Sequence, residues 1–180
     1  ELKAMAISPL DSTVFAGVFG DSEIGPLFSD AAEIEAMIDF ERALARAEAA
    51  CGVIPLEAGA ALDAAMRGLV IPPEELTEAT AAAAVPVTGL LVALRKRLDP
   101  NVAQWLHWGA TTQDIMDGSL LLRLRRSADI IDGRLTRLID TLLAAAEREA
   151  GTAMAGRTRS QVATPISFGL RIAQWAQPLI

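Results

Sequence analysis

The residues best suited to chemistry lie together at 105–114, in the sequence Trp-Leu-His-Trp-Gly-Ala-Thr-Thr-Gln-Asp. The segment contains His107, the only histidine of the chain. Its Gly-Ala-Thr-Thr part can turn the backbone while aiming the hydroxyls of Thr111 and Thr112 and free N–H groups at one point. Gln113 then opens a long helical pattern, and the N-terminus of a helix favours anions. The segment therefore predicts a site for a carboxylate or a phosphate.

A simpler interpretation of the same segment is an ordinary capped helix start. Thr112 or Asp114 would then cap the helix, and His107 would pack beneath it. Caps are common and sites are few, so the spacing alone leaves both interpretations open.

A second polar segment, Gly-Arg-Thr-Arg-Ser-Gln at 156–161, brings Arg157 and Arg159 together with Thr158 and Gln161. Guanidinium groups match the two oxygens of a carboxylate, so this segment suits planar anions. A solvated loop between two long antiparallel helices would explain the same residues.

The composition favours an all-α protein of 180 residues. The hydrophobic fraction is 52%, the aromatic fraction is only 4%, and much of the apolar content is alanine, a strong helix former. The net charge of −7 argues against nucleic acid as a partner, because nucleic-acid binding needs a basic surface. No run of 18 uncharged apolar residues is present, so we expect no membrane span.

Cysteine and histidine content bears on redox and metal chemistry. The single cysteine, Cys51, cannot form an internal disulfide and fits a reducing cytoplasm, where we expect the protein. One histidine and one cysteine far apart in sequence give no metal-ligand spacing, and no glycine-rich phosphate-binding motif is present. We therefore expect neither a metal nor a cofactor.

Apolar spacing and helix-ending residues predict the elements that position these segments. Residues 1–28 are loop-like. Helices are then expected from Asp30, which has Glu33 at capping-box spacing, to the stop at Gly52, at 56–66, from Pro72 to Ala84, and at 87–98. We expect an N-terminal helical domain over 1–100 and the start of a central domain of long helices over 101–180.

One long helix is predicted from Gln113 to Glu149, where proline is absent. Its apolar residues alternate spacings of three and four, which is typical of the seam of a helix in a bundle. At about 55 Å such a helix is too long for a compact monomeric domain, so we expect a bundle assembled across subunits. Gly118 and Gly133 each weaken the helix by about 1 kcal/mol relative to alanine. The leucine-rich seam consists of Leu121, Leu124, Ala128, Ile131, Leu135, Leu138 and Leu142.

Two further features complete the helical frame. Arg123, Arg125 and Arg126 are expected on a solvated helix face or in ion pairs between subunits. Thr164 and Pro165 have the residue types of an N-cap and a first helical position, and predict the start of the last helix.

Taken together, the two polar segments resemble signature segments of the fumarase/aspartase superfamily. Residues 107–114 are similar to its H-x-G-x-T-S-x-D segment, and residues 156–165 to its G-R-T-H-x-Q-x-A-x-P segment. The resemblance implies an all-α fold, with an N-terminal helical domain followed by the first long helices of a bundle, of which this chain is a fragment. The chain also resembles the first helix of the adenylosuccinate lyase branch, at residues 28–29, 41–45, 47–49 and 52–55.

Within that superfamily the chain looks most like the 3-carboxy-cis,cis-muconate cycloisomerase family, on the strength of residues 105–111, 19–21 and 168–175. The lyases carry histidine after Gly-Arg-Thr, where this chain has Arg159. Arginine cannot exchange a proton near neutral pH. A cycloisomerase loses less by that change, because its nucleophile is an already ionised carboxylate of the substrate.

The resemblance implies conversion of 3-carboxy-cis,cis-muconate, a small tricarboxylate, to 4-carboxymuconolactone in protocatechuate breakdown, the β-ketoadipate pathway. A carboxylate of the substrate would add across a double bond. His107 matches a family histidine implicated in ligand binding and is also the candidate catalytic residue, since histidine can donate a proton. The substrate-binding residues would be His107, Thr111, Thr112, Gln113, Arg157, Thr158, Arg159 and Gln161.

The resemblance also implies a homo-oligomer, a tetramer whose active sites combine segments of three subunits. The family's catalytic loop serine would lie beyond Ile180. The chain begins with Glu1 rather than methionine, and its last apolar pattern stops without a cap. We therefore expect a longer protein, and no activity from this chain alone.

Two other functions remain open. An adenylosuccinate- or argininosuccinate-type lyase would release fumarate, but it should carry histidine at position 159. A non-catalytic helical assembly module would keep the fold alone, and Thr112 and Arg157 could then change without loss of function.

Overall fold

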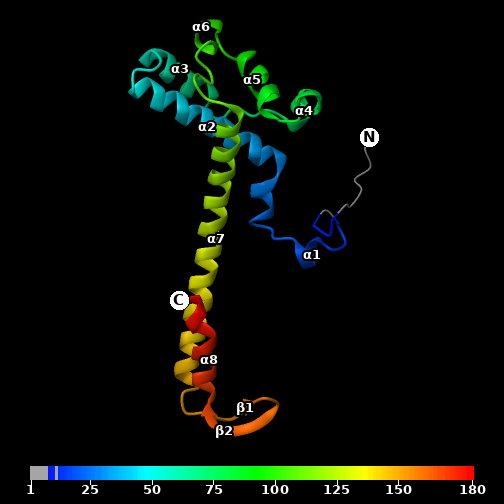
Figure 1. Cartoon of the computed structure of the whole chain (residues 1–180), viewed down its shortest axis with the longest axis vertical. Coiled ribbons are helices and arrows are strands. Elements are labelled where there is room, and N and C mark those ends of the chain that lie inside the picture. The colour runs from blue at the N-terminus through cyan, green and yellow to red at the C-terminus, as the bar shows by residue number, and fades with distance from the viewer. Residues whose placement is uncertain (1–7, 11) are drawn as a thin grey trace. The chain divides into compact units, whose positions relative to one another are not determined.

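The computed structural model describes residues 8–10 and 12–180 (Figure 1). Most of these residues are helical, which confirms the expected all-α class, and the one sheet among them is a two-stranded antiparallel hairpin. The chain forms two compact units, 1–127 and 128–180, which are described separately below. The expected division into 1–100 and 101–180 stays a prediction. Among the described residues, no helix is long and apolar enough to cross a bilayer.

The described residues of the first unit form six short or medium helices and the beginning of a long one. They are α1 (Ala16–Phe19), α2 (Asp30–Ala50), α3 (Leu56–Met66), α4 (Thr77–Ala83), α5 (Val87–Arg95), α6 (Pro100–Ala103) and α7 (Thr112–Arg148), with 3-10 turns at Gly25–Phe28 and Pro73–Leu76. Of the loop predicted over 1–28, residues 1–7 and 11 lie outside the described part, and the rest includes α1 and the first 3-10 turn. The short α6 was not predicted.

The predicted helix boundaries are confirmed for some helices and wrong for others. Helix α2 does begin at Asp30, but its cap is Ser29, whose Oγ accepts a hydrogen bond from the N–H of Ala32 at 3.3 Å. The helix predicted after Pro72 is instead a 3-10 turn followed by α4, which ends where Ala84 adopts a left-handed conformation with φ of 60°.

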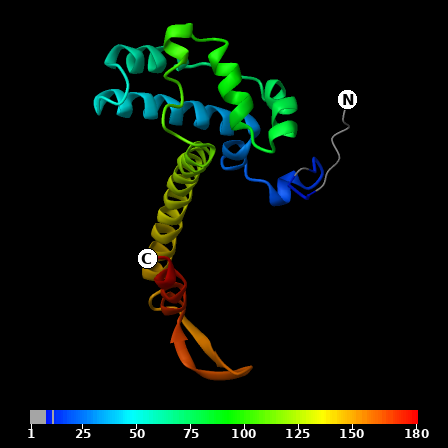
Figure 2. The same ribbon diagram turned by 45° about the horizontal axis from the view of Figure 1, so that its top comes forward.

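Helices α2, α3 and α5 enclose the hydrophobic core of this unit, and Ile115 of α7 packs into it. Both views show α3 running back alongside α2 (Figures 1 and 2). Gly59 permits this approach, because a Cβ there would lie 2.7 Å from the carbonyl oxygen of Ala45. Fully buried side chains such as Leu62 and Leu90 each contribute about 1.5–3 kcal/mol.

Asp63 of α3 joins the same two helices through charge. Its carboxylate accepts hydrogen bonds from Arg42 at 3.1 Å, Arg46 at 2.6 Å and Arg67 at 2.9 Å. Arg42 and Arg46 lie on α2, so this nearly buried carboxylate ties α2 to α3.

Helix α7 has almost the bounds predicted for it, but one of its arginines was placed wrongly. Arg123 is buried rather than solvated, with its Nε donating to the carbonyl of Ser119 at 3.3 Å. Its guanidinium lies 5.7 Å from the ring centroid of Phe28 and 3.7 Å from the carboxylate of Glu33. The leucine-rich seam, by contrast, is mostly exposed, with Leu121 65% exposed.

The second unit contains the last part of α7, the strands β1 (Ala153–Thr158) and β2 (Gln161–Ser167), helix α8 (Phe168–Ala176) and a 3-10 turn at Gln177–Leu179. Ser167 caps α8 by accepting from the N–H of Leu170 at 3.0 Å. The start predicted at Thr164 and Pro165 is wrong, because both residues lie in β2, where Pro165 pairs with Ala155. In both views α8 runs back along α7 (Figures 1 and 2).

Candidate active site

His107 lies in the loop between α6 and α7, within the first unit. Its backbone is left-handed, with φ of 61°, and Gly109 follows with φ of 70°. A left-handed conformation is uncommon for a residue with a side chain and tends to occur at functional sites. Together His107 and Gly109 turn the chain sharply just before α7 begins at Thr112.

A buried carboxylate holds the imidazole of His107. The ring Nδ1 lies 2.5 Å from Oε1 of Glu41, which belongs to α2 and is 1% exposed. Burial raises the pKa of Glu41, and the hydrogen bond and charge of His107 and the charge of Arg95 only partly oppose that rise. The His107 side chain is 11% exposed, so one edge of the ring still reaches the surface.

A second acidic side chain, Glu48, lies seven residues further along α2 and interacts with the same pair. Burial and then the charge of Glu41 raise the pKa of Glu48, and the charge of His107 opposes the rise. One oxygen of each carboxylate is buried without a hydrogen-bond partner among the described residues. Gly109 lies close by, since a Cβ there would be 3.9 Å from Oε1 of Glu48.

Neighbouring contacts fix the loop that carries His107. Arg95 at the end of α5 donates to the carbonyl of Leu106 at 3.5 Å. The rings of Trp105 and Trp108 pack against each other with centroids 4.9 Å apart. Leu106 itself is buried in the core. The position of the imidazole is therefore fixed both by the contact to its ring and by contacts to the loop that carries it.

The start of α7 has a cap and still presents polar groups. Asp114 is the third residue of α7 and accepts from the N–H of Thr111 at 2.8 Å, which is the contact of a capping box and not the N-cap predicted at Thr112 or Asp114. Gln113 donates to Asp117 at 2.6 Å. Thr111 and Gln113 are exposed and Thr112 is half-buried, so they can still meet a ligand.

The second polar segment is a hairpin rather than the loop that was predicted. Arg157 and Thr158 end β1, Gln161 begins β2, and Arg159 and Ser160 form the two-residue turn between them. Both turn residues have positive φ, 39° and 67°, as a type I′ turn requires. All five side chains are exposed.

The predicted site residues therefore fall into two groups, one in each unit. The first unit brings His107, Thr111, Thr112 and Gln113 together at the start of α7. The hairpin of the second unit carries the remaining residues, Arg157, Thr158, Arg159 and Gln161.

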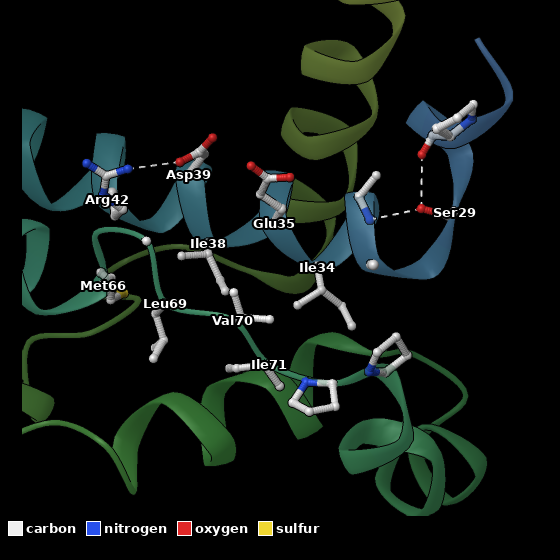
Figure 3. A pocket seen from close by; sticks show the side chains of 16 residues that line it. Ser29, Ile34, Glu35, Ile38, Asp39, Arg42, Met66, Leu69, Val70 and Ile71 are labelled. Atoms are coloured by element: carbon white, nitrogen blue, oxygen red, sulfur yellow. Dashed lines mark hydrogen bonds and ion pairs between the residues drawn. The ribbon is translucent and has the colours of Figure 1, made fainter. Parts of the chain in front are cut away.

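A pocket of about 500 Å³ lies between α2 and the segment 68–73 (Figure 3). Ile38 and Val70 are among its apolar lining residues, and Arg42 donates to Asp39 along one side (Figure 3). None of the predicted site residues lines this pocket. Among the described residues, no group of three or more histidine, cysteine and acidic side chains could hold a metal ion.

Glu41 and Glu48 were not predicted as site residues, although the sequence carried a signal. Both lie on the apolar stripe of α2, at helical spacing from Met37 and Ala45. A carboxylate on a buried face requires a partner. The partner, His107, lies 66 residues away in sequence, and no local pattern connects them.

Comparison with known proteins places the chain in a family. The model of the lyase family matches residues 22–180. The 3-carboxy-cis,cis-muconate cycloisomerase of Pseudomonas aeruginosa is 40% identical over 163 residues, which are 89% of this chain and 36% of that protein. The adenylosuccinate lyase of Methanocaldococcus jannaschii is 32% identical over 172 residues, which are 96% of this chain and 36% of that protein.

Comparison with solved structures supports the same family. The crystal structure of the 3-carboxy-cis,cis-muconate lactonizing enzyme from Pseudomonas putida matches with a TM-score of 0.84 and 37% identity, covering 93% of this chain and 39% of that one. The chain thus spans less than half the length of these relatives. The expected family membership is confirmed: the chain belongs to the lyase family, in the fumarase/aspartase superfamily that its two polar segments resemble.

Proposed function

We propose that this chain contributes to the active site of a cycloisomerase that converts 3-carboxy-cis,cis-muconate to 4-carboxymuconolactone. The observation that carries the proposal is Arg159, exposed at the tip of the hairpin in the position where the lyases have histidine. A guanidinium there can bind a carboxylate but cannot exchange a proton near neutral pH. The names of the relatives from Pseudomonas support the same choice.

The reaction needs little from the protein beyond charge, position and one proton. A carboxylate oxygen of the substrate forms a bond to carbon, the double bond opens, and the neighbouring carbon takes up a proton. Charge that develops on an adjacent carboxylate is stabilised by cationic and N–H donors. Thr111, Thr112 and Gln113 would bind one carboxylate at the start of α7. Arg157, Thr158, Arg159 and Gln161 would bind another, and His107 would bind the substrate or supply the proton.

The same proposal includes a homotetramer in the cytoplasm, with active sites shared between subunits. The exposed leucine-rich seam of α7 supports an assembly, because isolated proteins seldom expose such continuous apolar surface.

A lyase that releases fumarate is the second candidate, supported by relatives named adenylosuccinate lyase. It would need the chemistry of a histidine at position 159, which this chain lacks. A non-catalytic assembly module is the third, and it predicts no functional loss when Thr112 or Arg157 is changed.

A pair of chimeras tests these candidates. In one, this chain replaces the aligned segment of the Pseudomonas aeruginosa cycloisomerase, and in the other, that of the Methanocaldococcus jannaschii adenylosuccinate lyase. Loss of the diene absorbance of 3-carboxy-cis,cis-muconate is followed in the first and fumarate release in the second. Circular dichroism and sedimentation confirm that each chimera folds and assembles like its parent.

We expect turnover in the first chimera only. Arg159→Ala should lower its kcat/KM by about 10- to 100-fold, the equivalent of one charged hydrogen bond. In the second chimera, which we expect to be inactive, Arg159→His should give measurable fumarate release. Fumarate release with Arg159 in place, together with a folded but inactive first chimera, would favour the lyase. Full activity of Thr112→Ala and Arg157→Ala in either chimera would favour the assembly module.

A further inference from the structure

The environment of His107 distinguishes its two ring nitrogens. Nδ1 contacts Oε1 of Glu41 at 2.5 Å, and Glu41 is almost completely buried within α2. Burying a carboxylate without a partner costs folding free energy. The partner of Glu41 is the only imidazole of the chain. Nδ1 is therefore occupied, and Nε2 is the ring nitrogen left for other contacts.

We propose that Glu41 is a positioning residue that holds a proton on Nδ1 of His107, so that Nε2 is the nitrogen presented to the substrate. The hydrogen bond itself stands on the structure alone. The role of Nε2 rests on the proposed function.

The position of this proton decides what His107 can do. With Nδ1 kept protonated, Nε2 is the atom that gains and loses a proton. When protonated, it can donate to a substrate carboxylate or transfer its proton to the carbon that lactone formation leaves with a free electron pair. The ring then stays neutral with its proton on Nδ1, and Nε2 regains a proton from solvent. Each turnover consumes one proton, which matches the conversion of a carboxylate into an uncharged lactone.

Two other charged groups lie around the Glu41–His107 pair. Glu48 of α2 is a second carboxylate whose charge interacts with the imidazole. Arg95 of α5, the cation that also acts on Glu41, donates to the carbonyl of Leu106. An ionised carboxylate oxygen can only accept a hydrogen bond, so the ring nitrogen that contacts Oε1 of Glu41 must carry the proton.

The single histidine makes the test direct. Nitrogen-15 NMR of the imidazole in the 180-residue chain assigns each ring nitrogen as protonated or unprotonated across a pH titration, with no substrate present. In the neutral ring we expect the proton on Nδ1, slowly exchanging, and an unprotonated Nε2. Glu41→Leu removes the acceptor, so the slowly exchanging Nδ1 proton signal should disappear and the Nε2 signal should shift toward the protonated form.

Glu35→Leu is the matched control, because Glu35 is an exposed carboxylate of the same helix. This variant should keep the Nδ1–H form. A neutral ring protonated on Nε2 in the unmodified chain would overturn the inference, whether or not Glu41→Leu folds. The same holds if Glu41→Leu and Glu35→Leu leave identical spectra. Failure of the chimeras to turn over would instead contradict the proposed function and leave the tautomer result standing.

Discussion

Gly118 of α7 lies so close to the ring of Phe40 on α2 that a Cβ at position 118 would overlap the ring carbons Cδ2 and Cε2. A glycine in a helix is ordinarily a weakness, costing about 1 kcal/mol relative to alanine. Here it allows α7 to pack against the helix that carries Glu41.

Gly118→Ala should therefore destabilise the protein in spite of alanine's better helix propensity. Overpacking costs about 1–3 kcal/mol and the propensity gain is about 1 kcal/mol, which leaves an expected net loss of up to about 2 kcal/mol in the free energy of unfolding. Urea denaturation followed by circular dichroism measures it. Phe40→Leu combined with Gly118→Ala should recover part of the loss, because it removes the ring that the new methyl group meets.

Gly133 of the same helix is the matched control. A Cβ there would meet only the far end of the flexible Arg137 side chain, at 3.7 Å. Gly133→Ala should therefore stabilise the protein by about 0.5–1 kcal/mol. Equal effects of the two alanine substitutions would mean that the contact with Phe40 does not limit the packing of α7.

These two glycines illustrate how far the sequence could predict the fold. Helix α7 was predicted to within about a residue at each end, because proline-free apolar periodicity is a local property. Gly118 differs from Gly133 because it lies against Phe40, a side chain of another helix, and no local sequence pattern reveals that contact. The same reason explains why Glu41 was missed as the partner of His107.

The hairpin was missed for a different reason. A type I′ turn is usually signalled by Asn-Gly or Asp-Gly, and here the turn residues are Arg159 and Ser160. Thr164 and Pro165 also have the residue types of a helix start, although in β2 they are extended. The polar residues of this segment could be predicted, but their arrangement at a strained turn could not.

That strain leads to a prediction about Ser160. Its φ of 67° is unfavourable for a residue with a Cβ, so Ser160→Gly should stabilise the hairpin by up to about 1 kcal/mol. Hydrogen exchange of the Thr158 and Gln161 amides should slow accordingly, by up to about fivefold. Ser160→Ala keeps the Cβ and should not slow exchange. In the cycloisomerase chimera Ser160→Gly should retain turnover, whereas Arg159→Gly should lower kcat/KM about as much as Arg159→Ala, because both remove the guanidinium.

The ion cluster at Asp63 should contribute stability that depends on pH. Burial would raise the pKa of Asp63, but the hydrogen bond from Arg46 and the charges of Arg42 and Arg46 outweigh it and hold the pKa below 3.8. The contribution is therefore present above pH 3.8 and is lost as the pH falls through the lowered value. Asp63→Asn should cost about 1.5–3 kcal/mol at pH 7.

The unfolding free energy lost in Asp63→Asn should become smaller at acidic pH, and urea denaturation at several pH values can measure this. Glu57→Gln on the exposed surface of the same helix is the control and should change the unfolding free energy little at any pH. A cost for Asp63→Asn that stays constant down to pH 2 would contradict the assignment of the effect to the ionised carboxylate.

Glu41 should have the opposite pH dependence. Its folded pKa is raised above 4.5, mainly by burial, so from that pH upward the unfolded chain ionises first while the folded chain resists. The unfolded state then binds fewer protons, and the free energy of unfolding falls as pH rises through this window. In Glu41→Leu that fall should be smaller, whereas Glu35→Leu should show the slope of the unmodified chain. Parallel slopes for all three proteins would show that Glu41 ionises in the folded state as freely as in water.

The exposed seam of α7 provides the last prediction, which concerns assembly. Ile131 and Leu138 are 46% and 45% exposed, so burying the rest of each against another subunit would contribute about 0.7–1.4 kcal/mol. We expect the chain to self-associate at micromolar concentration in sedimentation velocity, and Ile131→Glu combined with Leu138→Glu to shift it to the monomer. Thr136→Glu adds a charge at an exposed position of the same helix outside the seam, and should leave the association intact. If Thr136→Glu dissociated the chain equally, added charge rather than lost apolar contact would be the cause, and the seam would not be the interface.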